Sequence, residues 1–172
     1  NADAALQKSY DLISTGNLDE ALRVLMTAID QDDRYAPLYI QRGIIHGRKG
    51  AFQEAVTDFT QALQIDPRNA EAYYSRALAY EKSGQKDKAV ADYGQAIVIN
   101  PRYAEAYFNR GLVYFSRANY DAAIADFLKA AESRPGYAKA FYNLGLAYEA
   151  KENQDLALTN YDRAISIDPA FI

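Results

Sequence analysis

The sequence contains no cysteine and no tryptophan, and it has only one histidine. Without cysteine there is no disulfide, no thiolate zinc site and no thiol nucleophile. The lone His46 has no second histidine with which to share a metal ion or a proton, so we expect it to be a packing residue. These gaps indicate a protein that uses no cofactor and no metal.

Long apolar runs and excess positive charge are also missing. No stretch approaches the roughly 18 consecutive apolar residues of a membrane span, so we expect a soluble segment without direct membrane insertion. The net charge of −4 disfavours nucleic acid and anionic membranes as partners. The chain opens with neither an initiator Met nor a signal segment, which indicates a processed form or an excised fragment. The cytoplasm is the first expectation for its location, and the periplasm or another processed location stays open.

Proline is rare but strictly placed. Four of the five prolines, at positions 67, 101, 135 and 169, are 34 residues apart. A period of this size is typical of helical repeat arrays. The length of 172 residues equals five such periods plus two residues, which predicts a single array over residues 1–172. Its units are 2–35, 36–69, 70–103, 104–137 and 138–171.

Each unit carries two helical patterns. In the second half, an alanine, a large apolar residue and another alanine follow at spacings of four and three, as in Ala123, Phe127 and Ala130. These spacings place the three side chains on one helical face. In the first half an aromatic residue is followed four positions later by a small one, as in Tyr107 and Gly111. Small residues let two helices approach closely, and the aromatic ring fills the space beside them. Glycines at positions 16, 50 and 84 predict helix ends.

The fourth unit resembles the tetratricopeptide repeat, whose signature is W-x2-L-G-x2-Y, then A-x3-F, then P. It carries, in order, Tyr107, Gly111, Tyr114, Ala123, Phe127, Ala130 and Pro135. The last four units share this pattern, while the first departs from it and has Asp33 at the proline position. The resemblance implies an all-α fold: a right-handed superhelical solenoid of helix-turn-helix units, with the first helices lining a concave groove. Five units leave no length for a separate capping helix.

Two further positions of the repeat carry opposite charges. Arginines at positions 42, 76 and 110 occur only in the units that have aspartates at 58, 92 and 126. The fifth unit lacks both partners and has Leu144 and Asn160 instead. This matched occurrence predicts an ion pair between the two helices of one unit rather than a basic ligand site. A solvent-exposed pair would contribute about 0–1 kcal/mol.

The residues one and two positions after the first-helix aromatic are expected to face the groove. The first of these columns contains Leu6, Ile40, Tyr74, Phe108 and Tyr142, and the second contains Gln7, Gln41, Ser75, Asn109 and Asn143. Aromatic rings supply apolar contact, and carboxamides both donate to and accept from a peptide backbone. The second column resembles the asparagine ladder in the superhelical arm of the O-GlcNAc transferase family. Asn109 and Asn143 match that ladder, Gln41 imitates it and Ser75 interrupts it. Alternatively, the aromatic column packs between neighbouring units and the asparagines are solvated.

These columns predict a peptide-binding surface. Its members are Ile40, Gln41, Tyr74, Phe108, Asn109, Tyr142 and Asn143, with Arg48, Lys82 and Lys139 selecting acidic side chains. We therefore hypothesise a non-catalytic interaction scaffold that binds an extended peptide or a partner helix. No nucleophile and base, convergent carboxylates or metal-ligand set indicates an enzyme.

Two alternative functions stay open. The last helix, near Ala157, Tyr161, Ala164 and Ile165, lacks an expected cover, which favours head-to-tail self-association into a homo-oligomer. The chain could also be the substrate-recruiting arm of a larger enzyme.

Overall fold

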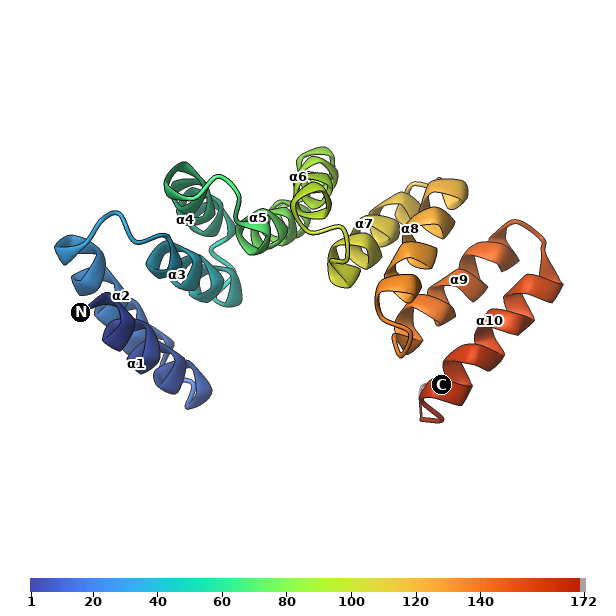
Figure 1. Cartoon of the computed structure of the whole chain (residues 1–172), viewed down its shortest axis with the longest axis horizontal. Coiled ribbons are helices and arrows are strands. Elements are labelled where there is room, and N and C mark those ends of the chain that lie inside the picture. Colours follow the sequence, from blue (N-terminus) through green and yellow to red (C-terminus); the bar gives the residue numbers. More distant parts are fainter. Residues whose placement is uncertain (171–172) are drawn as a thin grey trace. The chain divides into compact units, whose positions relative to one another are not determined.

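The computed structural model describes residues 1–170, all of whose regular structure is helical (Figure 1). The described residues form ten helices without a strand among them. They are α1 (Ala2–Ser14), α2 (Leu18–Gln31), α3 (Ala36–Arg48), α4 (Phe52–Ile65), α5 (Ala70–Lys82), α6 (Lys86–Ile99), α7 (Ala104–Ser116), α8 (Tyr120–Ser133), α9 (Ala138–Ala150) and α10 (Gln154–Ile167). Two helices fall in each predicted repeat, which confirms the all-α class. The last predicted repeat boundary, residue 171, lies outside the described residues.

The chain also divides within α6 into two compact parts, each larger than a 34-residue repeat. From here on, Asn1–Asp92 is called the first unit and Tyr93 onward the second unit, while the 34-residue elements are called repeats. In the first unit, α1 packs on α2, α3 on α4, and α4 on α5. In the second unit, α7 packs on α8, α8 on α9, and α9 on α10. Within each unit, most helix contacts therefore join elements adjacent in sequence, as expected for a repeat array.

The turn between the two helices of a repeat has a left-handed residue at the same position in all five repeats. Glycine occupies it at Gly16, Gly50 and Gly84, with φ near +80°. The prediction of helix ends at these glycines is confirmed. The fourth and fifth repeats make the same turn with Ala118 (φ 57°) and Glu152 (φ 59°). A left-handed residue with a Cβ costs about 1–2 kcal/mol, so backbone bonding must hold these two turns.

That backbone bonding is the same with and without glycine. The amide of Ala51 donates to the carbonyl of His46 at 2.9 Å, and Asn119 donates to Tyr114 at 3.0 Å. The Asn119 side chain also caps α8 by accepting from the amide of Ala122. The turn is therefore held by hydrogen bonds that close the first helix and begin the second.

In the second, fourth and fifth repeats, an aromatic ring of the second helix lies over a glycine of the first helix, as predicted. A Cβ built on Gly43 would lie 2.8 Å from Cε1 of Phe59, and one on Gly111 would lie 2.7 Å from Cε1 of Phe127. Phe127 is fully buried, and the alanines on either side of it in the predicted stripe are also fully buried. Glycine thus lets the ring lie directly against the backbone of the first helix.

The predicted ion pairs join the two helices of repeats two, three and four. Arg110 donates from Nε and Nη2 to the two carboxylate oxygens of Asp126, both at 2.8 Å. Its guanidinium also lies 6.0 and 5.9 Å from the ring centroids of Tyr107 and Tyr114. The hydrogen bond to Asp126 raises the pKa of Arg110. Only 7% of the Asp126 side chain is exposed, so the pair is not a surface pair and the expectation of a very small contribution does not apply.

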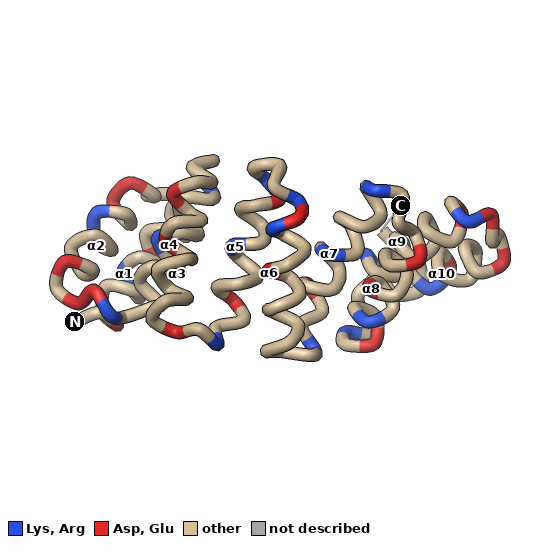
Figure 2. The backbone as a smooth tube through the Cα atoms, turned by 90° about the horizontal axis from the view of Figure 1, so that it is seen from above, with Lys and Arg blue, Asp and Glu red and all other residues tan. Residues whose placement is uncertain are grey.

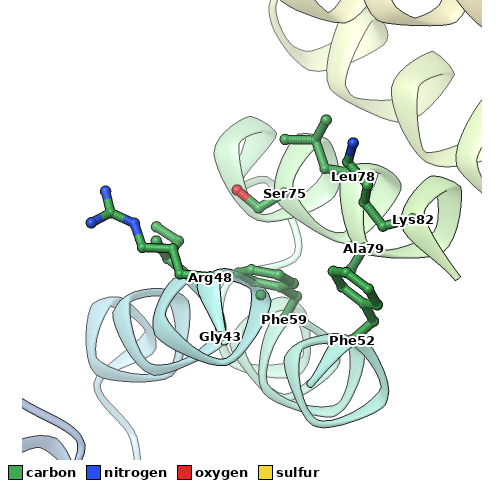
Figure 3. Close-up of a pocket in the computed structure, with 10 residues that line it drawn as sticks. Gly43, Arg48, Phe52, Phe59, Ser75, Leu78, Ala79 and Lys82 are labelled. Atoms are coloured by element: carbon green, nitrogen blue, oxygen red, sulfur yellow. The ribbon is translucent and has the colours of Figure 1, made fainter. Parts of the chain in front are cut away.

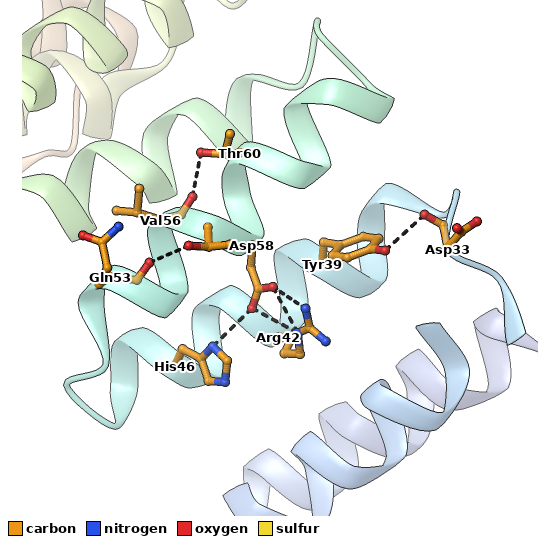
Figure 4. A network of polar contacts seen from close by, with 9 residues as sticks. Asp33, Tyr39, Arg42, His46, Gln53, Val56, Asp58 and Thr60 are labelled. Atoms are coloured by element: carbon orange, nitrogen blue, oxygen red, sulfur yellow. Dashed lines mark hydrogen bonds and ion pairs between the residues drawn. The ribbon is translucent and has the colours of Figure 1, made fainter. Parts of the chain in front are cut away.

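In the second repeat, histidine replaces the second tyrosine of this arrangement (Figure 4). Arg42 donates from Nη2 to Oδ1 of Asp58 at 2.6 Å. His46 Nδ1 lies 3.2 Å from Oδ2 of the same carboxylate, without the alignment of a hydrogen bond. His46 therefore packs at the edge of this network.

Candidate functional site

In the first unit, the predicted surface residues differ in accessibility. Ile40 and Gln41 are buried and leave little surface for a ligand. Tyr74 is half-buried, and Arg48 and Lys82 are exposed in the last turns of α3 and α5. A cation in the last turn of a helix also interacts favourably with the helix dipole. Burial thus removes Ile40 and Gln41 from the accessible part of the predicted surface.

In the second unit, Phe108 is buried as well. Its ring centroid lies 5.7 Å from that of Phe127 and 5.0 Å from that of Tyr137, so it packs between helices. Phe108 thus follows the alternative prediction for the first groove column, in which the apolar side chain packs inside the protein and does not face a ligand. The ring cannot reach a ligand without losing these contacts.

The other predicted residues of the second unit have more accessible surface. Tyr142 is exposed and its ring lies 5.6 Å from that of Tyr161. Burial raises the pKa of Tyr161, whose O–H also donates to Glu149. Lys139 is exposed and Asn143 is half-buried, with its Nδ2 donating to the carbonyl of Lys139 at 2.9 Å. Asn109 is also half-buried.

A pocket of about 340 Å³ lies between α3 and α5 in the first unit (Figure 3). The rings of Phe52 and Phe59 from α4 lie at its centre, and Leu78 and Ser75 of α5 line the other side. Arg48 and Lys82 stand at its edges. An apolar floor with a few charged groups at the rim is typical of a site for a small ligand or for one or two side chains of a peptide.

The sequence pattern predicted Arg48 and Lys82 but not the apolar residues of the pocket floor. Phe52 and Leu78 were not among the predicted site residues, because neither belongs to a column expected to face the groove. Gly47 also lines the pocket, and a Cβ built on it would meet nothing within 4 Å. The available signal was Gly47 itself, which follows neither the helix-end nor the aromatic-contact column of glycines.

Within residues 1–170, basic and acidic residues are interspersed with one another along both units (Figure 2). Lys49 of the second repeat pairs with Asp19 of the first at 2.6 Å, and Lys151 of the fifth pairs with Asp121 of the fourth. Much of the positive charge is therefore matched by nearby carboxylates. Among the described helices, none combines the length and the apolar character that crossing a bilayer requires.

Two sequence models of the same repeat family match this chain. The TPR repeat model matches residues 48–84 and 82–117, and the tetratricopeptide repeat model matches residues 104–137 and 138–171. The chain belongs to the tetratricopeptide repeat (TPR) family. TPR proteins are generally non-catalytic scaffolds that bind proteins or peptides. No curated protein sequence is significantly similar to this one.

Solved TPR structures match almost the whole chain. A crystal structure of MamA is 28% identical, with a TM-score of 0.86, and the match covers 94% of each chain. YrrB, described as a TPR protein with an unusual peptide-binding site, is 30% identical, with a TM-score of 0.78 and coverage of 99% of this chain and 88% of its own. A TPR protein from Parabacteroides merdae is 29% identical, with a TM-score of 0.84 and coverage of 99% and 68%. The fold is therefore a helical solenoid.

Proposed function

We propose that this TPR chain is a non-catalytic interaction scaffold that binds an extended peptide on the surface formed by the first helices of its repeats. The observation that carries the proposal is the apolar pocket between α3 and α5 with Arg48 and Lys82 at its edges. The similarity to YrrB, described as having a peptide-binding site, supports the same class of ligand.

Each unit offers its own chemistry for binding a peptide. In the first unit, the pocket takes an apolar side chain, and Tyr74 lies on the same helix as Ser75 and Leu78 of its lining. In the second unit, Tyr142 offers an exposed ring, and the amides of Asn109 and Asn143 bond the peptide backbone. Lys139 favours acidic side chains by charge. Backbone bonding supplies general affinity, and the apolar contacts select the sequence.

Replacing both Asn109 and Asn143 by alanine should weaken peptide binding by about fivefold to a hundredfold, because two backbone hydrogen bonds are lost. The ligands are peptides selected on the wild-type chain from a random peptide library, and fluorescence anisotropy measures their dissociation constants. The melting temperature should change little.

Asn160→Ala is the matched control. Asn160 donates from Nδ2 to the carbonyl four residues earlier at 2.8 Å, and Asn143 makes the same kind of bond. Asn160, however, lies on α10, the second helix of its repeat, and so outside the proposed surface of first helices. Equal binding by the double variant and the wild type would remove the asparagines from the site. Failure to select any peptide would overturn the proposed function itself.

A second candidate function, self-association, is favoured by the outer face of α10. Leu158 and Ile165 are 60% and 36% exposed, while Val56 and Leu63, at the same positions of the second repeat, are 7% and 8% exposed. Those two residues belong to the core where α4 packs on α5. The predicted patch members Ala157 and Ala164 are buried, so the apolar face is formed by Leu158 and Ile165 instead.

The geometry favours a symmetrical contact over the head-to-tail contact expected from the sequence. In a head-to-tail contact, α1 would cover α10 as α5 covers α4. The corresponding face of α1 is polar, since Asp11 stands at the position of the buried Ile45 and bonds Gln7 at 3.3 Å. Burying the Asp11 carboxylate against Leu158 would be costly, because its hydrogen bond comes from the neutral amide of Gln7.

Light scattering over a range of concentrations tests this second candidate. We expect a dimer at micromolar concentrations, and Leu158→Glu should make it monomeric because charge would be placed in the apolar contact. Tyr10→Glu, which puts the same charge on an exposed ring of α1, should leave the dimer intact. A wild-type chain that stays monomeric up to high micromolar concentration would contradict the candidate.

A further inference from the structure

The second and fourth repeats carry very different side chains at one position near the end of the first helix. Gly47 lines the pocket between α3 and α5. Phe115 stands at the same position of α7, two repeats later. Its ring lies 5.3 Å from that of Tyr120 in an edge-on arrangement, and Tyr120 corresponds to Phe52 of the pocket. The fourth repeat thus places its own aromatic ring where the second repeat has only a glycine.

The first repeat also fills this place with a large side chain. Ile13 and Leu18 stand at the positions of Gly47 and Phe52, and both pack against the core of the first unit. Phe52 therefore differs from Leu18 and Tyr120, because Gly47 provides no side chain to cover it. A ring or large apolar group from outside the chain can take the same place.

The cations at the pocket edge follow the same division. Where Phe115 occupies the position of Gly47, Ser116 and Ala150 replace Arg48 and Lys82. In the first repeat, Ser14 stands at the position of Arg48. The pocket lining contains both cations and, among its residues, neither an aspartate nor a glutamate. Cations at the rim of a pocket whose lining holds no acidic residue complement a negatively charged ligand.

We propose that the Gly47 pocket binds an acidic protein segment that inserts one aromatic side chain against Phe52, with its flanking carboxylates beside Arg48 and Lys82. This inference rests on the proposed peptide-binding function and names the class of peptide. The inserted ring takes the place of Phe115 in the other unit and meets the ring of Phe52 edge-on, the preferred geometry of aromatic pairs. Exposed cations at the rim supply selectivity and faster association rather than the main affinity. Gly47 is the residue that determines whether the pocket is open.

The direct test uses a fluorescein-labelled peptide with a central phenylalanine and two acidic residues on each side. Gly47→Phe should weaken its binding by about ten- to a hundredfold, since the new ring closes the pocket as Phe115 does. Gly47→Ala is the matched control. Its Cβ meets nothing within 4 Å, so it should bind like the wild type. Both variants should melt at or above the wild-type temperature, because a helical glycine is replaced.

Two further arms test the ring and the charges separately. A peptide with alanine in place of its phenylalanine should lose as much affinity as Gly47→Phe causes. Arg48→Ser combined with Lys82→Ala, which copies Ser116 and Ala150, should weaken binding by about three- to tenfold and flatten its salt dependence. A lysine-flanked peptide should bind more weakly than the acidic one.

Three outcomes would overturn the proposal. The first is an acidic aromatic peptide that fails to bind, or binds Gly47→Phe as well as the wild type. The second is binding of laurate in a Gly47→Phe-sensitive way without peptide binding, which would assign the pocket to a lipid. The third is selection, from a random library, of peptides that lack an aromatic residue or ignore Gly47→Phe. In this third case the proposed peptide-binding function stands while the pocket assignment falls.

Discussion

Phe127→Ala should lower the free energy of unfolding of this TPR chain by about 3–5 kcal/mol. The ring of Phe127 is fully buried, lies against the backbone at Gly111 and is 5.7 Å from the ring of Phe108. Removing it leaves a cavity that the rigid contact between α7 and α8 cannot close. Urea denaturation followed by circular dichroism measures the loss.

Leu128→Ala, one residue further on, is the control for that change. Leu128 is exposed, so its truncation should alter stability by no more than about 0.5 kcal/mol. Similar losses from the two variants would show that the ring of Phe127 does not hold the fourth repeat together.

Arg110→Leu should lower the free energy of unfolding by about 3 kcal/mol, because it leaves the buried Asp126 carboxylate without its cationic partner. Only 7% of the Asp126 side chain is exposed, and both of its oxygens accept from Arg110. The 22% exposure of the arginine side chain places the expected loss at the lower end for a buried pair.

The fifth repeat supplies the rescue for this variant. Leu144 and Asn160 occupy the positions of Arg110 and Asp126 there, so a repeat can be built with a neutral pair. Arg110→Leu combined with Asp126→Asn should recover most of the lost stability in a double-mutant cycle. A loss below about 1 kcal/mol for the single variant would mean that water reaches the carboxylate and that the pair behaves as a surface pair.

The repeat architecture was predictable because its determinants lie in short, repeated spacings. The stripe of Ala123, Phe127 and Ala130 sets one buried face, and matched charges identify the contact between Arg110 and Asp126. The turns at Ala118 and Glu152 were not predictable from glycine alone. Their left-handed conformation is imposed by the helices on either side, which no local residue preference reports.

The candidate site was only partly predictable. Helical spacing places Ile40, Gln41 and Phe108 beside the first-helix aromatics, but how deeply each is buried depends on the side chains that pack on it from other segments. Large neighbours such as Tyr137 cover Phe108, while small residues such as Ser75 leave space. The pocket depends on a missing side chain at Gly47, and column counting assigns no role to an absent group.

The contrast between Gly47 and Phe115 has a consequence for how such arrays diversify. One helix position decides whether the space between successive first helices is filled or open, while the ring-over-glycine contacts at Gly43 and Gly111 hold the helices in place in both cases. After a repeat is duplicated, a change at this one position could create or erase a receptor without altering helix length or register. If the proposed pocket binds a ligand, that binding can be copied with a repeat and lost by a single substitution, with little change in the fold.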